Sequence, residues 1–146
     1  MYKKILVPLD GSPLAEAVLP HAQALAKSEG AEIVLLRVAV TPARYLFAHN
    51  PAEGNNVIQM IEKEAEDYMQ AEVSKLQNEG VKVTGVTRDG MAPDTILDVA
   101  EEIHADVIAM STHGRSGVQR WLMGSVADKV VHYSHIPVML IRPSLN

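Results

Sequence analysis

The residues best suited to chemistry lie in one glycine-containing segment, STHGRSGVQRWLMGS, at positions 111–125. Gly114 and Gly117 let the backbone turn tightly and approach a ligand without hindrance from a Cβ atom. The hydroxyls of Thr112 and Ser116 add hydrogen-bond donors next to these glycines. This combination is typical of loops that cradle phosphate, although glycines before a helix also occur as simple turn residues.

The end of this segment indicates the same chemistry. Gly124 and Ser125 precede a predicted helix, and the free amides at a helix start attract a phosphate group. Asp128 stands three residues after Ser125, which is the spacing of a capping box. Arg115 is the one cation in the first turn of the loop, and His113 could stack on a ligand or orient the loop backbone. The segment matches neither GxGxxG nor GxxxxGK followed by Ser or Thr, so any phosphate site here is of another kind.

Asp10 is a second candidate, because it directly follows the first apolar run of the chain. Acidic residues at strand ends of nucleotide-binding folds accept hydrogen bonds from ribose or help to hold Mg²⁺. The alternative, given equal weight, is a turn aspartate that caps the next helix. No Ser-His-Asp or paired-carboxylate arrangement follows from the spacing, so we expect no catalytic residues. His132 and His135 have no third ligand nearby in the sequence, so we expect no metal site built by the protein alone.

Apolar runs of strand length alternate with helical patterns along the chain. The predicted strands are residues 3–9, 31–40, 81–87, 106–110 and 137–141. The predicted helices, each with apolar residues at three-and-four spacing, span 13–30, 57–77, 93–103 and 126–133. Pro20 should kink the first helix. Residues 41–56 contain two prolines and a glycine and are interpreted as a mobile flap.

Strict alternation of strands and helices predicts a parallel sheet with helices on both faces, because each right-handed crossover returns a helix over the sheet. We expect an α/β, doubly wound, five-stranded sheet of order 3-2-1-4-5, a flavodoxin- or Rossmann-like three-layer sandwich. The run at 81–87 alternates apolar with polar or small residues, as an edge strand does. Ligands bind such sheets where the strand order reverses, so Asp10 and Ser111 should meet in a crevice between the first and fourth strands.

Composition restricts the classes of function. With 13 basic and 18 acidic side chains the net charge is -5, which opposes approach to a nucleic acid backbone. The 146 residues include no cysteine, so a reducing compartment such as the cytoplasm is expected. No apolar run approaches the roughly 18 residues of a membrane span, and the start MYKKILVPLDGS lacks a signal-peptide core. We expect one soluble domain, residues 1–146, without nucleic acid or membrane partners.

Three stretches, VPLDGS, ADVIAMSTHGRSGVQRWLMGSVADKVV and the closing IPVMLIRP, resemble the universal stress protein family, and the resemblance covers the whole chain. ATP-binding members share a pattern of glycine, two residues, glycine, nine residues, and glycine followed by serine or threonine. Gly114, Gly124 and Ser125 fit this pattern, whereas Ser111 stands in place of the first glycine. We therefore expect nucleotide binding to be retained with an altered affinity.

The resemblance implies ATP or another adenine nucleotide as ligand. The place of Asp10 at a strand end would let it help to hold Mg²⁺ that accompanies the nucleotide. The resemblance implies that Pro8 and Asp10 line the ribose and base pocket, that Val38 meets adenine through its backbone, and that the loop and last helix hold the phosphates. The predicted nucleotide-binding residues are Pro8, Asp10, Val38, Ser111, His113, Gly114, Arg115, Ser116, Gly117, Gly124, Ser125 and Val126.

Three functions remain open from the sequence. The first is a dimeric, ATP-binding regulatory protein of the stress response, in which nucleotide occupancy alters the flap and a surface for an unknown protein partner. The second is a slow Mg²⁺-dependent ATPase or phosphotransfer enzyme, with Asp10 holding the metal and His113 or Arg115 stabilising the γ-phosphate. The third is a nucleotide-independent dimeric scaffold. The family also suggests that homodimers pair through the last strand, at 137–141, which is apolar enough to serve as such an edge.

Overall fold

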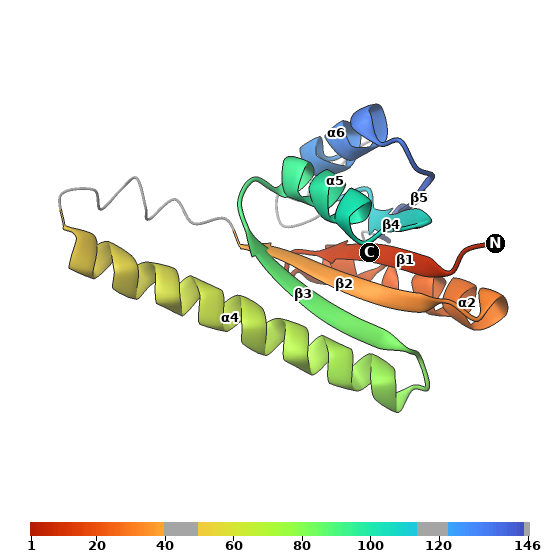
Figure 1. Cartoon of the computed structure of the whole chain (residues 1–146), viewed down its shortest axis with the longest axis horizontal. Coiled ribbons are helices and arrows are strands. Elements are labelled where there is room, and N and C mark those ends of the chain that lie inside the picture. Colours follow the sequence, from red (N-terminus) through yellow and green to blue (C-terminus); the bar gives the residue numbers. More distant parts are fainter. Residues whose placement is uncertain (40–49, 114–122, 145–146) are drawn as a thin grey trace.

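In the computed structural model, which describes residues 1–39, 50–113 and 123–144, strands and helices alternate along the chain (Figure 1). The strands are β1 Lys4–Leu9, β2 Glu32–Ala39, β3 Val83–Asp89, β4 Val107–Ser111 and β5 Val138–Ile141. The helices of the described ranges are α1 Pro13–Glu16, α2 Leu19–Glu29, α4 Pro51–Asn78, α5 Ala92–Glu102 and α6 Ser125–Tyr133. All strand boundaries agree with the predicted ones to within two residues.

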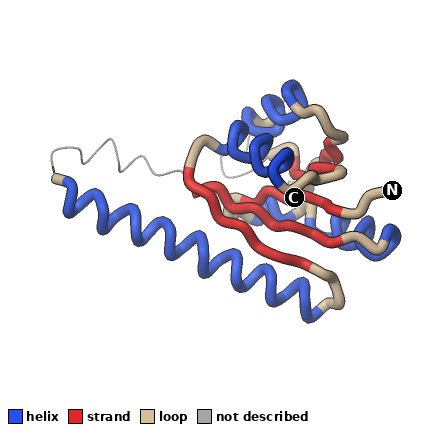
Figure 2. Tube along the Cα trace, viewed as in Figure 1, coloured by secondary structure: helices blue, strands red, loops and turns tan. Residues whose placement is uncertain are grey.

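The strands form one parallel sheet in the order β3-β2-β1-β4-β5. They are the red segments of Figure 2, which has the same view as Figure 1. β1 lies in the centre, and its register with β2 runs from Lys4 opposite Glu32 to Leu9 opposite Arg37. The chain first builds outward from β1 to β3 and then crosses to the other side of β1, so the order reverses between β1 and β4. The predicted doubly wound α/β fold, its strand order and the edge position of β3 are confirmed.

Successive residues of β2 point to opposite faces of the sheet and enter two hydrophobic cores. Ile33 and Leu35 pack with apolar side chains of α1, α2 and α4. Val34 and Leu36 pack with those of α5 and α6. In Figure 1, α2 and α4 lie on one side of the strands and α5 and α6 on the other. Because helices cover both faces, β2 reads as a nearly continuous apolar run rather than an alternating one.

The first helical segment forms two helices, where a single helix kinked at Pro20 was expected. Ser12 caps α1, since its Oγ accepts a hydrogen bond from the Ala15 N–H at 3.2 Å. α1 ends at Glu16, and α2 begins anew at Leu19, with Pro20 in its first turn. The first-turn amides of a helix have no partner within it, so a proline there removes no helical hydrogen bond. The chain breaks the helix before Pro20 instead of bending it.

α4 begins at Pro51, earlier than the predicted start at Val57. The Asn50 side chain caps it by accepting a hydrogen bond from the Glu53 N–H at 3.4 Å. The predicted flap at 41–56 is therefore wrong for residues 50–56, which form the cap and the first turns of α4. Residues 41–49 lie outside the described part of the chain. Neither α4, with 28 residues, nor any other helix of the described part of the chain is both long and apolar enough to cross a membrane.

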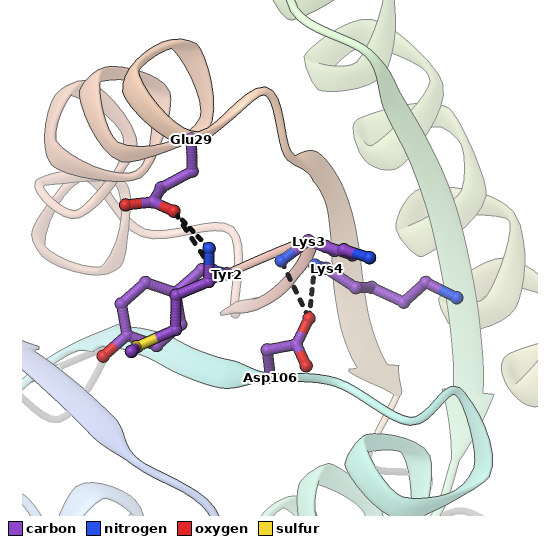
Figure 3. Close-up of polar contacts among 6 residues, drawn as sticks. Tyr2, Lys3, Lys4, Glu29 and Asp106 are labelled. Atoms are coloured by element: carbon purple, nitrogen blue, oxygen red, sulfur yellow. Dashed lines mark hydrogen bonds and ion pairs between the residues drawn. The ribbon is translucent and has the colours of Figure 1, made fainter.

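Two carboxylates hold the amino-terminal end of the sheet (Figure 3). Asp106, just before β4, accepts hydrogen bonds from the backbone N–H groups of Lys3 and Lys4 at 2.8 and 2.9 Å. These two bonds lower the pKa of the Asp106 carboxyl below its ordinary value. Glu29 at the end of α2 accepts a hydrogen bond from the amino group of Met1 at 2.8 Å. Contacts within the chain thus join β1, β4 and α2 at this end of the sheet.

Candidate functional site

A cavity of about 260 Å³ opens at the carboxyl ends of β1, β2 and β4, and the starts of α5 and α6 complete its wall. It lies at the reversal of strand order, which is the usual ligand position in open α/β sheets. The crevice expected between the first and fourth strands is therefore present. Eight of the predicted binding residues line it: Pro8, Asp10, Val38, Ser111, His113, Gly124, Ser125 and Val126.

The other four predicted binding residues lie outside the described part of the chain: Gly114, Arg115, Ser116 and Gly117. Sequence reasoning missed a group of apolar cavity residues: Leu9, Ala15, Leu36, Ala92, Ile96, Met110 and Ala127. Their periodicity correctly marks buried faces of strands and helices. It contains no signal that separates a side chain packed wholly in the core from one that also borders a cavity.

Apolar side chains of β2, β4 and α5 form one part of the wall. Leu36 and Val38 of β2 belong to the same core as Ile96 of α5 and Met110 of β4. All four border the cavity, together with Ala92 at the start of α5. Such a surface suits a flat ring, because most small-molecule sites are apolar and use a few polar groups to orient the ligand.

Asp10 both shapes the chain and faces the cavity. Its Oδ1 accepts hydrogen bonds from the backbone N–H of Ser12 at 2.9 Å and from the Ser12 hydroxyl at 2.6 Å. Ser12, not Asp10, is the N-cap residue of α1, so the alternative of a capping aspartate is wrong; Asp10 instead orients the serine that caps the helix. The residue also lines the cavity, and a carboxylate can accept about four hydrogen bonds in total. The structural role therefore does not exclude contact with a ligand.

Three consecutive polar residues lie at the end of β4: Ser111, Thr112 and His113. Ser111 and His113 are buried, and all three border the cavity. The His113 N–H donates to the Ser111 hydroxyl at 3.4 Å, and Thr112 Oγ1 lies 2.9 Å from His113 Nδ1. Pairing with β5 extends to this point, since the Thr112 N–H donates to the Ile141 carbonyl at 2.9 Å. The sheet thus holds the backbone that carries these side chains.

α6 begins at the cavity without a side-chain cap. Gly124 is the N-cap residue and Ser125 is the first residue of the helix. The predicted capping box of Ser125 and Asp128 is therefore wrong, because Ser125 stands one position too far into the helix to cap it. The amides of Ser125, Val126 and Ala127 have no acceptor within the helix, and these residues line the cavity. Aligned helix dipoles add partial positive charge, so this end of the cavity favours an anion.

Gly124 sets the distance between the end of β4 and the start of α6. Its N–H donates to the Thr112 carbonyl at 2.8 Å. A Cβ atom at position 124 would lie 2.7 Å from that same carbonyl oxygen. The oxygen belongs to the backbone and cannot move aside as a flexible side chain could, so the contact requires glycine.

The environments in the cavity follow the order of the elements around it. β2 and α5 supply apolar side chains, β1 and β4 supply Asp10 and Ser111, and α6 supplies amides that have no acceptor within the helix. This arrangement can receive an elongated ligand with an apolar ring, a hydroxylated centre and an anionic end. Within the described ranges, no three His, Asp or Glu side chains are grouped so as to hold a metal ion.

Relatives of known family match almost the whole chain. The family model described as the universal stress protein family matches residues 1–142. The universal stress protein MJ0531 of Methanocaldococcus jannaschii is 34% identical over 146 residues, covering 97% of this chain and 83% of that relative. A universal stress protein of Methanothermobacter thermautotrophicus is 34% identical over 151 aligned residues, covering 97% of each chain.

Solved structures agree with this match. The structure of MJ0577, also from Methanocaldococcus jannaschii, has a TM-score of 0.88 at 30% identity and covers 100% of this chain and 99% of its own. A universal stress protein from Archaeoglobus fulgidus, in complex with dAMP, has a TM-score of 0.69 at 26% identity and covers 97% of this chain and 98% of its own. Because sequence and fold both match over nearly the full length, the chain belongs to the universal stress protein family.

Proposed function

We propose that the chain binds an adenine nucleotide in this cavity and acts as a regulatory protein of the stress response, with a state that depends on nucleotide occupancy. The observation that carries the proposal is the order of environments in the cavity: an apolar wall, a polar centre and an uncapped helix start. A nucleotide presents a base, a sugar and phosphates in the same order. The relative in complex with dAMP supports adenine as the base.

The size of the cavity is consistent with a ligand whose nucleoside part lies inside it and whose phosphates extend beyond it. A volume of about 260 Å³ lies just below the usual range of about 300–1,000 Å³ for small-molecule sites. The described walls therefore suit the nucleoside part, with the base against Leu36, Val38 and Ile96. The phosphates would extend to the amides at the start of α6, where each charge-assisted hydrogen bond contributes about 1.5–3 kcal/mol.

Two contacts support the regulatory part of the proposal, because they connect the elements of the cavity with α4. The first contact joins α1, which follows Asp10, to α4: the Glu16 carboxylate of α1 accepts a hydrogen bond of 2.8 Å from the Tyr68 hydroxyl of α4. β2, whose end forms part of the apolar wall, is joined to α4 by an ion pair of 2.9 Å between Arg37 and Glu64. A nucleotide that tightens α1 or β2 would thereby also stabilise α4. Hydrogen exchange should show slower exchange of α4 amides when ATP is bound.

The test of binding is calorimetric titration of nucleotide-free protein with MgATP and with adenosine, in wild type and Ser125→Pro. Proline suits the first position of a helix, and the extended backbone of Gly124 tolerates a proline after it. The variant thus removes the Ser125 amide donor while α6 can still form. We expect ATP to bind about tenfold or more weakly, since one charge-assisted hydrogen bond is lost. Adenosine should bind as in wild type.

Ser125→Ala is the matched control, because it removes the hydroxyl and keeps the amide. It should lose less ATP affinity than Ser125→Pro if the amide is the main contact. Equal weakening of ATP and adenosine by Ser125→Pro would show that the phosphates do not reach this helix start. Absence of ATP binding by the wild type would reject the nucleotide function and favour the scaffold alternative.

We further propose that the chain forms a homodimer through β5, the strand within the predicted interface at 137–141. β5 is an edge strand, and all four of its residues are only partly buried in the single chain. A charge on an edge strand opposes pairing with a second edge. Sedimentation velocity should show a dimer for the wild type and a monomer for Met139→Lys. Met60→Lys, on the exposed surface of α4, is the matched control and should remain dimeric.

A further inference from the structure

Ser111 has a buried hydroxyl group that is only partly satisfied within the chain. The residue ends β4, is 7% exposed and borders the cavity. Its Oγ accepts a long hydrogen bond of 3.4 Å from the His113 N–H. In the described part of the chain, no acceptor receives the Ser111 hydroxyl proton. Burial of a donor without an acceptor is unfavourable, so this proton is available to a ligand that enters the cavity.

The surroundings of Ser111 define what kind of ligand oxygen it would meet. β1 and β4 are neighbours in the sheet, and Asp10 and Ser111 line the cavity at their carboxyl ends. A carboxylate only accepts hydrogen bonds and repels phosphate, whereas a serine hydroxyl can also donate. A sugar hydroxyl satisfies both, because it can donate to Asp10 and accept from Ser111. A phosphate oxygen can accept from Ser111 but cannot donate to Asp10.

We propose that Ser111 is a specificity residue whose hydroxyl donates to a ribose hydroxyl of the bound nucleotide, so that the site distinguishes ribose from deoxyribose. The inference rests on the proposed nucleotide function and names the side chain that recognises the sugar. A site built to hydrogen-bond a ligand hydroxyl rejects an analogue that lacks it, because the polar groups of the site are then left unpaired. Asp10, which borders the same cavity, would accept the proton of that hydroxyl.

The test is a double-mutant cycle in which the second change is made in the ligand. ATP, 2′-deoxy-ATP and 3′-deoxy-ATP are titrated into nucleotide-free wild type, Ser111→Ala and Ser111→Gly. We expect wild type to bind ATP about tenfold more tightly than one of the two deoxy analogues, the change that one hydrogen bond accounts for. In Ser111→Ala this preference should fall to about twofold, through weaker ATP binding with the deoxy analogue unchanged.

The controls separate the possible outcomes. Ser125→Ala removes a hydroxyl at the start of α6, the phosphate end of the cavity. Any loss of affinity should be equal for ATP and the deoxy analogues, so the ribose preference should stay as in wild type. Ser111→Gly also removes the Cβ atom and should lose the preference as Ser111→Ala does. It serves as a second variant if Ser111→Ala folds poorly. Urea unfolding of each variant checks its folding. An unchanged preference in both variants overturns the inference while ATP binding upholds the nucleotide function. No adenine nucleotide binding by any of these proteins overturns both.

Discussion

The hydroxyl of Tyr68 on α4 donates a hydrogen bond of 2.8 Å to the carboxylate of Glu16 on α1. The Arg37 guanidinium lies 5.2 Å from the centre of the Tyr68 ring and forms an ion pair with Glu64. Arg37 is only 5% exposed, and it directly follows the four apolar residues 33–36 of β2. α1, β2 and α4 are thus joined by a polar cluster beneath the long helix.

Tyr68→Phe should lower the free energy of unfolding by about 1 kcal/mol at pH 8, because the hydrogen bond to Glu16 is lost. Burial, and after it this hydrogen bond, raises the pKa of Tyr68 above its ordinary value of about 10. The folded state therefore keeps a proton that the unfolded chain loses above pH 10, and stability falls as the pH rises. Urea unfolding measured from pH 8 to 11 should show a smaller fall in the free energy of unfolding for Tyr68→Phe than for the wild type.

Tyr133→Phe is the matched control for this exchange, because Tyr133 is 62% exposed. A fall in stability above pH 10 that is equally steep in wild type and Tyr68→Phe would contradict the assignment to Tyr68.

Glu64→Gln should destabilise the fold by about 1–2 kcal/mol, less than the loss of a fully buried pair because Glu64 is half exposed. The variant leaves the buried Arg37 cation without its ion-pair partner. Arg37→Met should be close to neutral, since it removes the buried charge and fills its space with apolar atoms. Urea unfolding of both, with the exposed Glu66→Gln as control, measures the difference. A larger loss for Arg37→Met than for Glu64→Gln would show that the charge itself stabilises the fold.

Gly85→Ala should destabilise the fold by about 1–3 kcal/mol through overpacking. A Cβ atom at position 85 on β3 would lie 2.9 Å from Cγ2 of Val73 on α4. Val73→Ala removes that methyl group, so the double variant should be more stable than the sum of the two single effects predicts, by more than about 0.5 kcal/mol. The measurement is the free energy of unfolding of the wild type, the two single variants and the double variant. If the two single effects simply add, the strain of Gly85→Ala does not come from its contact with Val73.

Asp106→Ala should lower the unfolding midpoint at pH 7, because the Lys3 and Lys4 amides lose their shared acceptor. These bonds lower the pKa of Asp106, so the charged carboxylate stabilises the fold above the ordinary aspartate pKa of about 3.9. That stabilisation is lost as the pH falls through the lowered pKa of the folded state. The difference between wild type and variant should therefore shrink below about pH 4, as followed by thermal unfolding from pH 7 to 2.5. Asp98→Ala, at an exposed position of α5, should show no such convergence.

The sequence by itself determined the order of elements and the topology. Periodicity located every strand to within two residues, and strict alternation with helices led to the observed strand order and to a crevice that joins Asp10 and Ser111. Helix starts were less certain, because competing local signals decide them. Asn50-Pro51 does contain the capping signal of α4, but the glycine and asparagines that follow it favour a loop in the sequence.

Only the tertiary structure decided which residues meet across elements. Nothing local in the sequence says that Arg37 lies beneath α4, that Gly85 allows Val73 to approach β3, or that Ile96 faces a cavity rather than only the core. The same holds for the buried hydroxyl of Ser111. Periodicity records which side of an element is buried, whereas the partner of each buried side depends on how the helices settle on the sheet. That choice is made by packing between residues far apart in the chain, and no short-range pattern encodes it.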